Sequence, residues 1–216
     1  MKSISRVKRS KEDARQSYNK MSRWYDLFTN SEKKFTDLGL EILNLKSGEN
    51  ILEIGFGTGH ALPILAHAAH PATVCGVDLS EKMCILSKKK LARAGLANFV
   101  NLQKGDASRL PYKKNSFDAL FISFTLELFD TPEIPIVLSE CLRVLKNKGR
   151  LSVVSLAKEN SRAVHIYEYF HRLMPKTVDC RPIYAKESLE NAGFQIIKSK
   201  EEKMWGLPVS ILLAEK

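Results

Sequence analysis

The sequence is poor in cysteine, has no long apolar run and has no flexible linker, and each lack excludes a class of protein. Four cysteines are spread along 216 residues without a Cys-x-x-Cys pair, so neither a zinc site nor a disulfide framework is expected. No apolar run reaches the roughly 18 residues that a membrane-spanning helix needs. The basic residues 1–10 lack the apolar centre of a signal peptide. We therefore expect a cytoplasmic protein, at most peripheral to a membrane.

Proline, glycine and serine do not gather into a linker that would divide the chain. A chain of this size folded as one unit buries roughly 70% of the surface that it exposes when unfolded. Stability therefore requires neither a metal nor a disulfide. The sequence predicts a single domain over residues 1–216.

Positive charge is concentrated at the start of the chain. The formal net charge is +10, and residues 1–23 hold eight Lys or Arg against two acidic residues. Such a cluster indicates an anionic partner, which could be a lipid headgroup, a nucleic acid or an acidic substrate. The alternative is a solvated terminus without a partner.

The hydrophobic pattern changes period near residue 50. Apolar residues recur at helical spacing over residues 4–28 and 31–45, which predicts two helices, the first with its basic residues on the opposite face. Short apolar runs and helical segments then alternate, which predicts an α/β fold with a mostly parallel sheet. The expected strands are 51–55, 73–78, 99–103, 117–123 and 150–156, followed by a terminal antiparallel hairpin of 194–200 and 207–214.

A glycine-rich turn joins the first predicted strand to the next helix. Gly55, Gly57 and Gly59 lie where an open α/β sheet binds its ligand. The dinucleotide fingerprint would require glycine at position 60, which is His60, and the Lys-Ser/Thr of a P-loop is absent. Glu53 precedes the turn within an apolar strand, so its charge needs a compensating group.

Polar residues follow the next three strands as well. Asp78 is placed to accept hydrogen bonds from ribose hydroxyls, Asp106 from an adenine amino group, and Ser123 lies beside the same crevice. Each has a plainer interpretation, as the cap of a following segment or as a turn residue. Their occurrence at successive strand ends favours a nucleoside-binding crevice.

Four segments together resemble the class I S-adenosylmethionine-dependent methyltransferases. They are ILEIGFGTG (51–59), GVDLS (76–80), GDA (105–107) and CLRVLK (141–146). YNKMSRWYD (18–26) and RPI (181–183) resemble the ubiquinone/menaquinone-biosynthesis methyltransferases and related phospholipid N-methyltransferases. The resemblance covers about residues 15–216. One departure is Asn147-Lys148-Gly149, where relatives commonly have Pro-Gly-Gly, and we expect a changed turn there. His60 is a second departure, because it is not typical of the quinone methylases.

The resemblance implies a Rossmann-like seven-stranded sheet of order 3-2-1-4-5-7-6, with strand 7 antiparallel and helices on both faces. It implies S-adenosylmethionine as cofactor and S-adenosylhomocysteine as product. It also places residues 1–30 as a lid helix over the crevice. The residues expected to bind the cofactor are Tyr18 and Tyr25 on the lid, Glu53, Gly55, Gly57 and Gly59 at the methionine part, Asp78 at the ribose, Leu79 and Met83 on one adenine face, Asp106 and Ala107 at its edge, and Ser123.

Methyl transfer needs alignment of the acceptor and exclusion of water rather than a nucleophilic side chain or a metal. We assign no metal ligand, no catalytic base and no oligomeric state; His60, His165 and His171 have ordinary structural interpretations. The expected acceptor is a small molecule or a lipid, of the quinone-precursor or phospholipid-headgroup type. Methylation of RNA or DNA is the alternative, although the Asn/Asp-Pro-Pro-Tyr/Phe segment of base amino-group methylases is missing after the fourth strand. A non-catalytic S-adenosylmethionine-binding protein is a third hypothesis.

Overall fold

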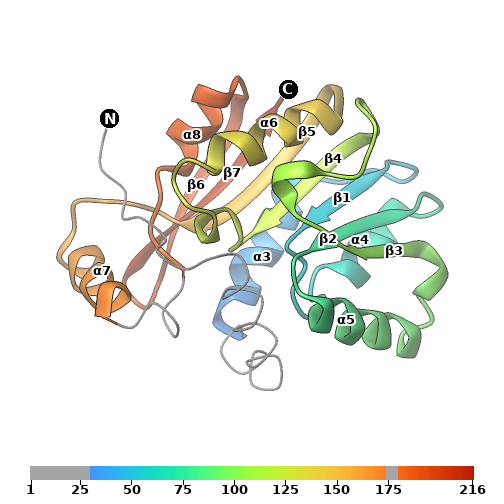
Figure 1. Ribbon diagram of the computed structural model, residues 1–216, viewed down its shortest axis with the longest axis horizontal. Coiled ribbons are helices and arrows are strands. Elements are labelled where there is room, and N and C mark those ends of the chain that lie inside the picture. The colour runs from blue at the N-terminus through green and yellow to red at the C-terminus, as the bar shows by residue number, and fades with distance from the viewer. Residues whose placement is uncertain (1–29, 174–179) are drawn as a thin grey trace.

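The computed structural model describes residues 30–173 and 180–216, which form a twisted sheet with helices on both faces (Figure 1). The helices are α3 (Asn30–Leu43), α4 (Leu62–Ala69), α5 (Glu81–Arg93), α6 (Ile134–Val144), α7 (Arg162–Leu173) and α8 (Ala185–Ala192), with short 3₁₀ turns η1 (Ala97–Phe99), η2 (Ala107–Arg109) and η3 (Leu126–Leu128). The strands are β1 (Ile51–Ile54), β2 (Val74–Asp78), β3 (Val100–Lys104), β4 (Phe117–Ser123), β5 (Leu145–Leu156), β6 (Gln195–Met204) and β7 (Leu207–Glu215). The predicted lid helix lies outside the described residues.

The strand order is β3-β2-β1-β4-β5-β7-β6, which confirms the order implied by the resemblance. Strands β1 to β5 pair in parallel, and β7 is antiparallel to both β5 and β6. The β6–β7 hairpin turns at Trp205 and Gly206, which both have positive φ (+52° and +81°). Two such residues make the tight turn that matches the twist of the adjoining strands.

The sheet separates two hydrophobic cores because side chains alternate along each strand. One core holds apolar residues of α3, α4 and α5 against Phe121, Val154 and Ile211. The other holds residues of α6 and α8 against Leu120 and Val153. Both faces of the central strands are therefore covered, as the continuous apolar runs of the sequence predict for a parallel sheet.

The observed elements differ from the predicted ones mainly at their ends and in one helix. Ser80 is the N-cap of α5, as expected, because its hydroxyl accepts from the Met83 amide. Helix α8 was not predicted. The turn at Asn147–Gly149 lies inside the longer strand β5, and Lys148 adopts φ +61° there.

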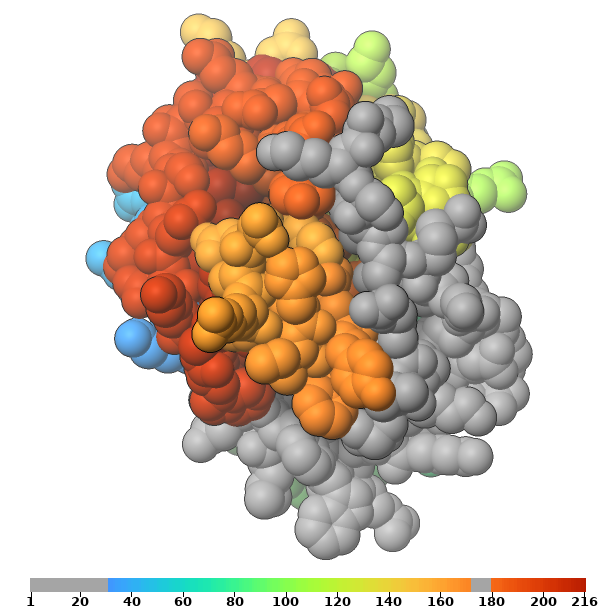
Figure 2. Space-filling view, turned by 90° about the vertical axis from the view of Figure 1, so that its left-hand side faces the viewer, coloured from blue at the N-terminus to red at the C-terminus, as the bar shows by residue number. Residues whose placement is uncertain are grey.

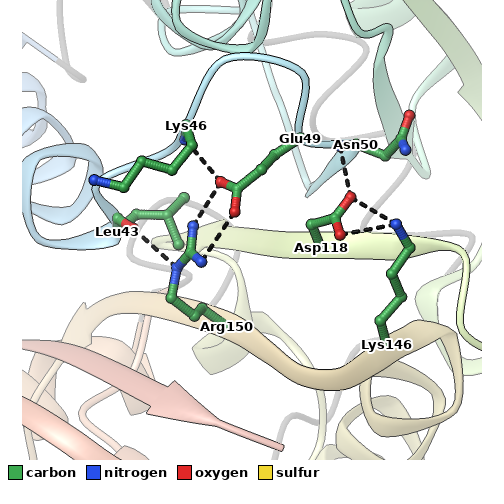
Figure 3. A network of polar contacts seen from close by, with 7 residues as sticks. All are labelled: Leu43, Lys46, Glu49, Asn50, Asp118, Lys146 and Arg150. Carbon is green, nitrogen blue, oxygen red and sulfur yellow. Dashed lines mark hydrogen bonds and ion pairs between the residues drawn. The ribbon is translucent and has the colours of Figure 1, made fainter.

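A polar network fixes the amino-terminal edge of the sheet (Figure 3). The Arg150 guanidinium of β5 donates to both carboxylate oxygens of Glu49, at 3.1 and 2.6 Å, and its Nε donates to the Leu43 carbonyl at the end of α3. The carboxylate of Asp118 accepts from Lys146 Nζ and from the Asn50 amide, at 2.8–2.9 Å. The network joins the α3–β1 connection to β4 and β5, on the side of the sheet away from the strand ends that carry the predicted site.

Among residues 30–173 and 180–216, no helix combines the length and apolar character that crossing a bilayer would require.

Candidate active site

The glycine turn lies at the carboxyl end of β1 and presents bare backbone. Gly55, Gly57 and Gly59 all have positive φ, between +50° and +74°, a conformation that other residues resist. A Cβ at position 55 would lie 2.3 Å from the Thr125 side chain, and one at position 59 would lie 2.8 Å from the Ser87 hydroxyl. Glycine is therefore required at both ends of the turn by contacts as well as by backbone conformation.

Asp78, at the carboxyl end of β2, holds the glycine turn in place. Its Oδ2 accepts from the Gly57 amide at 2.9 Å, and its Oδ1 accepts from the Ser80 amide at 2.8 Å. Burial raises the pKa of this carboxyl, and the two amide hydrogen bonds offset part of that rise. Asp78 can therefore cap the following segment and also accept from ribose hydroxyls, because each of its carboxylate oxygens keeps a second lone pair.

The residues predicted around the adenine lie at the ends of β2 and β3. Asp106 caps η2, where its Oδ1 accepts from the amide and hydroxyl of Ser108. Ala107 is buried beside it, and Leu79 is partly exposed. Met83 is buried in the core on the α5 side of the sheet. The structure brings these residues to one edge of the sheet, and their contacts with a cofactor stay a prediction.

Glu53 is buried beneath the glycine turn. Burial, with a smaller contribution from the charge of Asp78, raises its pKa to about 8. Among the described residues, Oε2 of this carboxyl has no hydrogen-bond partner. A buried acceptor of this kind next to a bare backbone turn fits a ligand that carries hydroxyl and ammonium donors. S-adenosylmethionine carries such donors, so these residues fit it as the cofactor.

Two further residues of this edge are not among the predicted cofactor-binding residues. The Thr125 hydroxyl lies 3.3 Å from the Gly55 carbonyl, and Glu127, two residues further on, is completely buried. Ser123, which was predicted, shares a hydrogen bond of 2.8 Å with the Thr36 hydroxyl and so ties β4 to α3. The signal for Glu127 was present in the sequence, because a charged residue stands within the apolar run Phe124–Phe129, as Glu53 does within β1.

His60 follows the turn and pairs with α3. Its Nε2 lies 2.8 Å from Oδ1 of Asp37, and both side chains are partly exposed. This pair joins the glycine turn to α3, which agrees with the structural interpretation of His60. Tyr18 and Tyr25 lie outside the described residues.

Comparison with known proteins agrees with this geometry. Residues 52–153 match the methyltransferase domain family. A demethylmenaquinone methyltransferase of Lactobacillus johnsonii is 32% identical over 162 residues, which are 73% of this chain and 64% of that protein. The namesake protein of Staphylococcus aureus is 30% identical over 204 residues, 92% of this chain and 77% of its own length. The match thus spans less than two thirds of the first relative and more than three quarters of the second.

A solved structure shares the fold of this chain. The crystal structure of a SAM-dependent methyltransferase from Aquifex aeolicus superimposes with a TM-score of 0.69 and 22% identity, over 92% of this chain and 97% of that one. At this identity the likeness concerns the fold alone, whereas the Staphylococcus relative carries the family assignment. The chain belongs to the S-adenosylmethionine-dependent methyltransferases.

Proposed function

We propose that this protein transfers a methyl group from S-adenosylmethionine to a ring carbon of a prenylated hydroquinone. The observation that carries the proposal is the arrangement at the carboxyl edge of the sheet, where the glycine turn, Asp78 and Asp106 follow successive strands. The quinone-type acceptor is supported by the relatives, which are named for demethylmenaquinone.

The residues of the crevice divide the work of binding. The turn at Gly55–Gly59 would accommodate the methionine part, with the buried Glu53 facing its ammonium group. Asp78 and Asp106 would accept from the ribose and the adenine. When bound, the cofactor supplies an electrophilic methyl group on a positively charged sulfur. The chain aligns the acceptor and excludes water, which is what an in-line displacement needs.

The same arrangement supports a proposal for the acceptor's place. A nucleoside held over β1, β2 and β3 leaves the ends of β4 and β5 for the second substrate. We propose that residues 1–216 act as one methyltransferase domain and that residues 1–30 cover this side as a lid, with Tyr18 and Tyr25 on its inner face.

We also propose peripheral contact with a membrane, where a prenylated acceptor is dissolved. Two features support it. The first 23 residues carry six excess positive charges, and helix α7 exposes Ile166, Tyr169 and Phe170, at 59%, 57% and 45% of their surfaces. Figure 2 shows α7, in orange, at the surface of the molecule. Aromatic and aliphatic side chains beside basic residues are typical of interfacial membrane binding.

The proposed reaction is tested by incubation with methyl-labelled S-adenosylmethionine and a short-chain prenylated 1,4-dihydroxynaphthalene kept reduced. We expect label in the organic extract, in a product heavier than the acceptor by one methyl group in place of hydrogen. Parallel reactions with phospholipid vesicles and with RNA and DNA serve as controls. Label confined to one of those fractions, or no label in any, would contradict the proposed acceptor.

A further inference from the structure

Glu127 follows the segment that contacts the glycine turn, on the side proposed for the acceptor. It belongs to η3, which follows β4 directly. Thr125 of the same segment contacts Gly55, because its hydroxyl lies 3.3 Å from the Gly55 carbonyl. Glu127 is two residues beyond that contact, and its Oε1 accepts from the Leu156 amide, 3.1 Å away at the end of β5. The carboxyl is thus anchored over the ends of β4 and β5.

Oε1 of the Glu127 carboxyl accepts a hydrogen bond, and Oε2 accepts none from the described residues. Glu127 exposes none of its surface, and within residues 30–173 and 180–216 no group makes a hydrogen bond to its Oε2. A buried carboxyl with an unsatisfied oxygen is costly. The Leu156 amide needs only one acceptor, which an uncharged side chain could supply. The hydrogen bond that anchors η3 to β5 therefore does not explain why this position carries a carboxyl group with a second, buried oxygen.

Two charged side chains act on the Glu127 carboxyl, one from α3 and one from the connection before α8. Burial is the largest cause of its raised pKa, which is about 8, and the charge of Glu32 on α3 adds to the rise. The charge of Arg181, in the connection before α8, acts in the opposite direction. Arg181 is itself buried and donates to the Phe129 carbonyl and to the Thr131 hydroxyl. A raised pKa of about 8 suits a carboxyl to the task of a general base.

We propose that Glu127 binds a hydroxyl group of the acceptor through Oε2 and takes its proton during methyl transfer. The proposal rests on the proposed function, since it concerns the same site and names a hydroxylated aromatic ring as the acceptor class. A nucleoside over β1 to β3 and an anchored carboxyl over β4 and β5 leave the acceptor between the methyl group and Glu127.

The proton and electron balance is complete without a further reactant. The acceptor O–H bond breaks, its proton goes to Oε2, and the electron pair left on oxygen makes the neighbouring ring carbon nucleophilic. That carbon forms a bond to the methyl group while the methyl–sulfur bond breaks and its pair returns to sulfur. The ring carbon then loses its hydrogen as a proton to solvent, and the oxygen regains a proton from Glu127. The carboxylate is restored.

The first test measures binding without methyl transfer. Calorimetry on protein saturated with S-adenosylhomocysteine compares 1-naphthol with 1-methoxynaphthalene, which has no hydroxyl proton, at pH 6 and pH 8.5. Ionisation of Glu127 between these values creates a charge-assisted hydrogen bond, so we expect 1-naphthol to bind roughly 10-fold more tightly at pH 8.5. The methoxy compound should show no change.

Glu127→Gln should remove this pH dependence, because glutamine keeps the acceptor for Leu156 but cannot ionise. Its affinity for S-adenosylhomocysteine should stay within about 2-fold of the wild type, which checks the fold. Glu41→Gln, at an exposed position of α3, is the matched control and should behave as wild type. In methyl transfer, Glu127→Gln should lower kcat by roughly 10²–10⁴-fold and abolish the rise of kcat toward pH 8.

The outcomes separate the two proposals. The Glu127 proposal is wrong if 1-naphthol does not bind, if both compounds respond to pH alike, or if Glu127→Gln binds and methylates as the wild type does. Transfer to the quinol that is indifferent to Glu127→Gln would overturn the role of this residue and leave the proposed function intact. Binding of 1-naphthol through Glu127, without any transfer to the quinol, would refute the proposed function alone.

Discussion

At the scale of single residues, replacing a glycine of the site destabilises the protein in two separable ways, through backbone strain and through a steric clash. Gly55 has φ +74°, and a Cβ there would lie 2.3 Å from Thr125. Gly48 has φ +81° but nothing within 4 Å of the corresponding Cβ position. The two positions therefore share the backbone strain of a left-handed conformation, and only the first adds a steric clash at the cofactor turn.

We expect Gly48→Ala to lower the free energy of unfolding by about 1 kcal/mol through backbone strain alone. Gly55→Ala should cost about 1–3 kcal/mol more, because overpacking adds to the strain. It should also weaken S-adenosylhomocysteine binding by at least roughly 10-fold, since the turn must shift away from Thr125. Chemical denaturation and calorimetry on the two variants check this. Equal effects of the two substitutions on binding would show that the contact with Thr125 is irrelevant.

At the scale of elements, the two edges of the sheet have different tasks. The carboxyl edge carries Glu53 and Glu127, whose pKa values burial raises to about 8. At the amino edge, burial also opposes ionisation of Glu49, yet its hydrogen bonds to Arg150 and to the Lys46 amide lower its pKa overall. The carboxyl groups whose ionisation burial disfavours, Glu53 and Glu127, therefore lie at the candidate site. The carboxylate of Glu49, which Arg150 stabilises in its charged form, instead links the α3–β1 connection to β5.

Glu49→Gln should therefore lower the stability of the protein without affecting the cofactor site. Glu49 and Arg150 are mostly buried, exposing 19% and 24% of their side chains, so we expect a loss of about 1–2 kcal/mol at pH 7. Because the folded-state pKa of Glu49 is lowered, its stabilisation is present above the unfolded value and is lost as pH falls below about 4.5. Urea denaturation at pH 7 and pH 3.5 checks this, with Glu41→Gln as control. A stability difference that persists undiminished at pH 3.5 would contradict the charge argument.

The sequence predicted the sheet because each central strand is a short apolar run that is buried on both faces. It did not predict α8, whose eight residues include few apolar positions, chiefly Ala185 and Leu189, and which depends on packing against the core with α6. The site was predictable where a motif carries it, at Gly55–Gly59 and Asp78. The anchoring of Glu127 by the end of β5 was not, because it joins residues 29 positions apart.

At the scale of the whole molecule, surface features gather at the edge that holds the site. Strand β6 runs parallel to β5, since both are antiparallel to β7, so the hairpin tip at Trp205 lies at the carboxyl edge. Trp205 exposes 74% of its surface. Helix α7 follows β5 at the same edge and exposes Ile166, Tyr169 and Phe170. Exposed apolar side chains thus lie at the same edge of the sheet as the candidate site.

The proposed membrane contact predicts two separable contributions to vesicle binding. Neutralising the basic terminus by Arg6, Lys8, Arg9, Lys11 and Arg15 to Gln should remove the part of the affinity that falls with salt, since each charge near an anionic surface contributes about 1 kcal/mol. Replacing Ile166 and Phe170 of α7 by Ser should remove a part that salt does not affect, through loss of apolar burial. Sedimentation with vesicles containing phosphatidylglycerol, at low and high salt, measures both contributions. Ile136→Ser on α6 is the control, because the exposed fraction of Ile136 lies between those of Ile166 and Phe170. S-adenosylhomocysteine affinity should be unchanged throughout, because every variant keeps all the residues predicted to bind the cofactor. A wild-type protein that stays in the supernatant at low salt, or variants that sediment as it does, would exclude the membrane as the place where the acceptor is taken up.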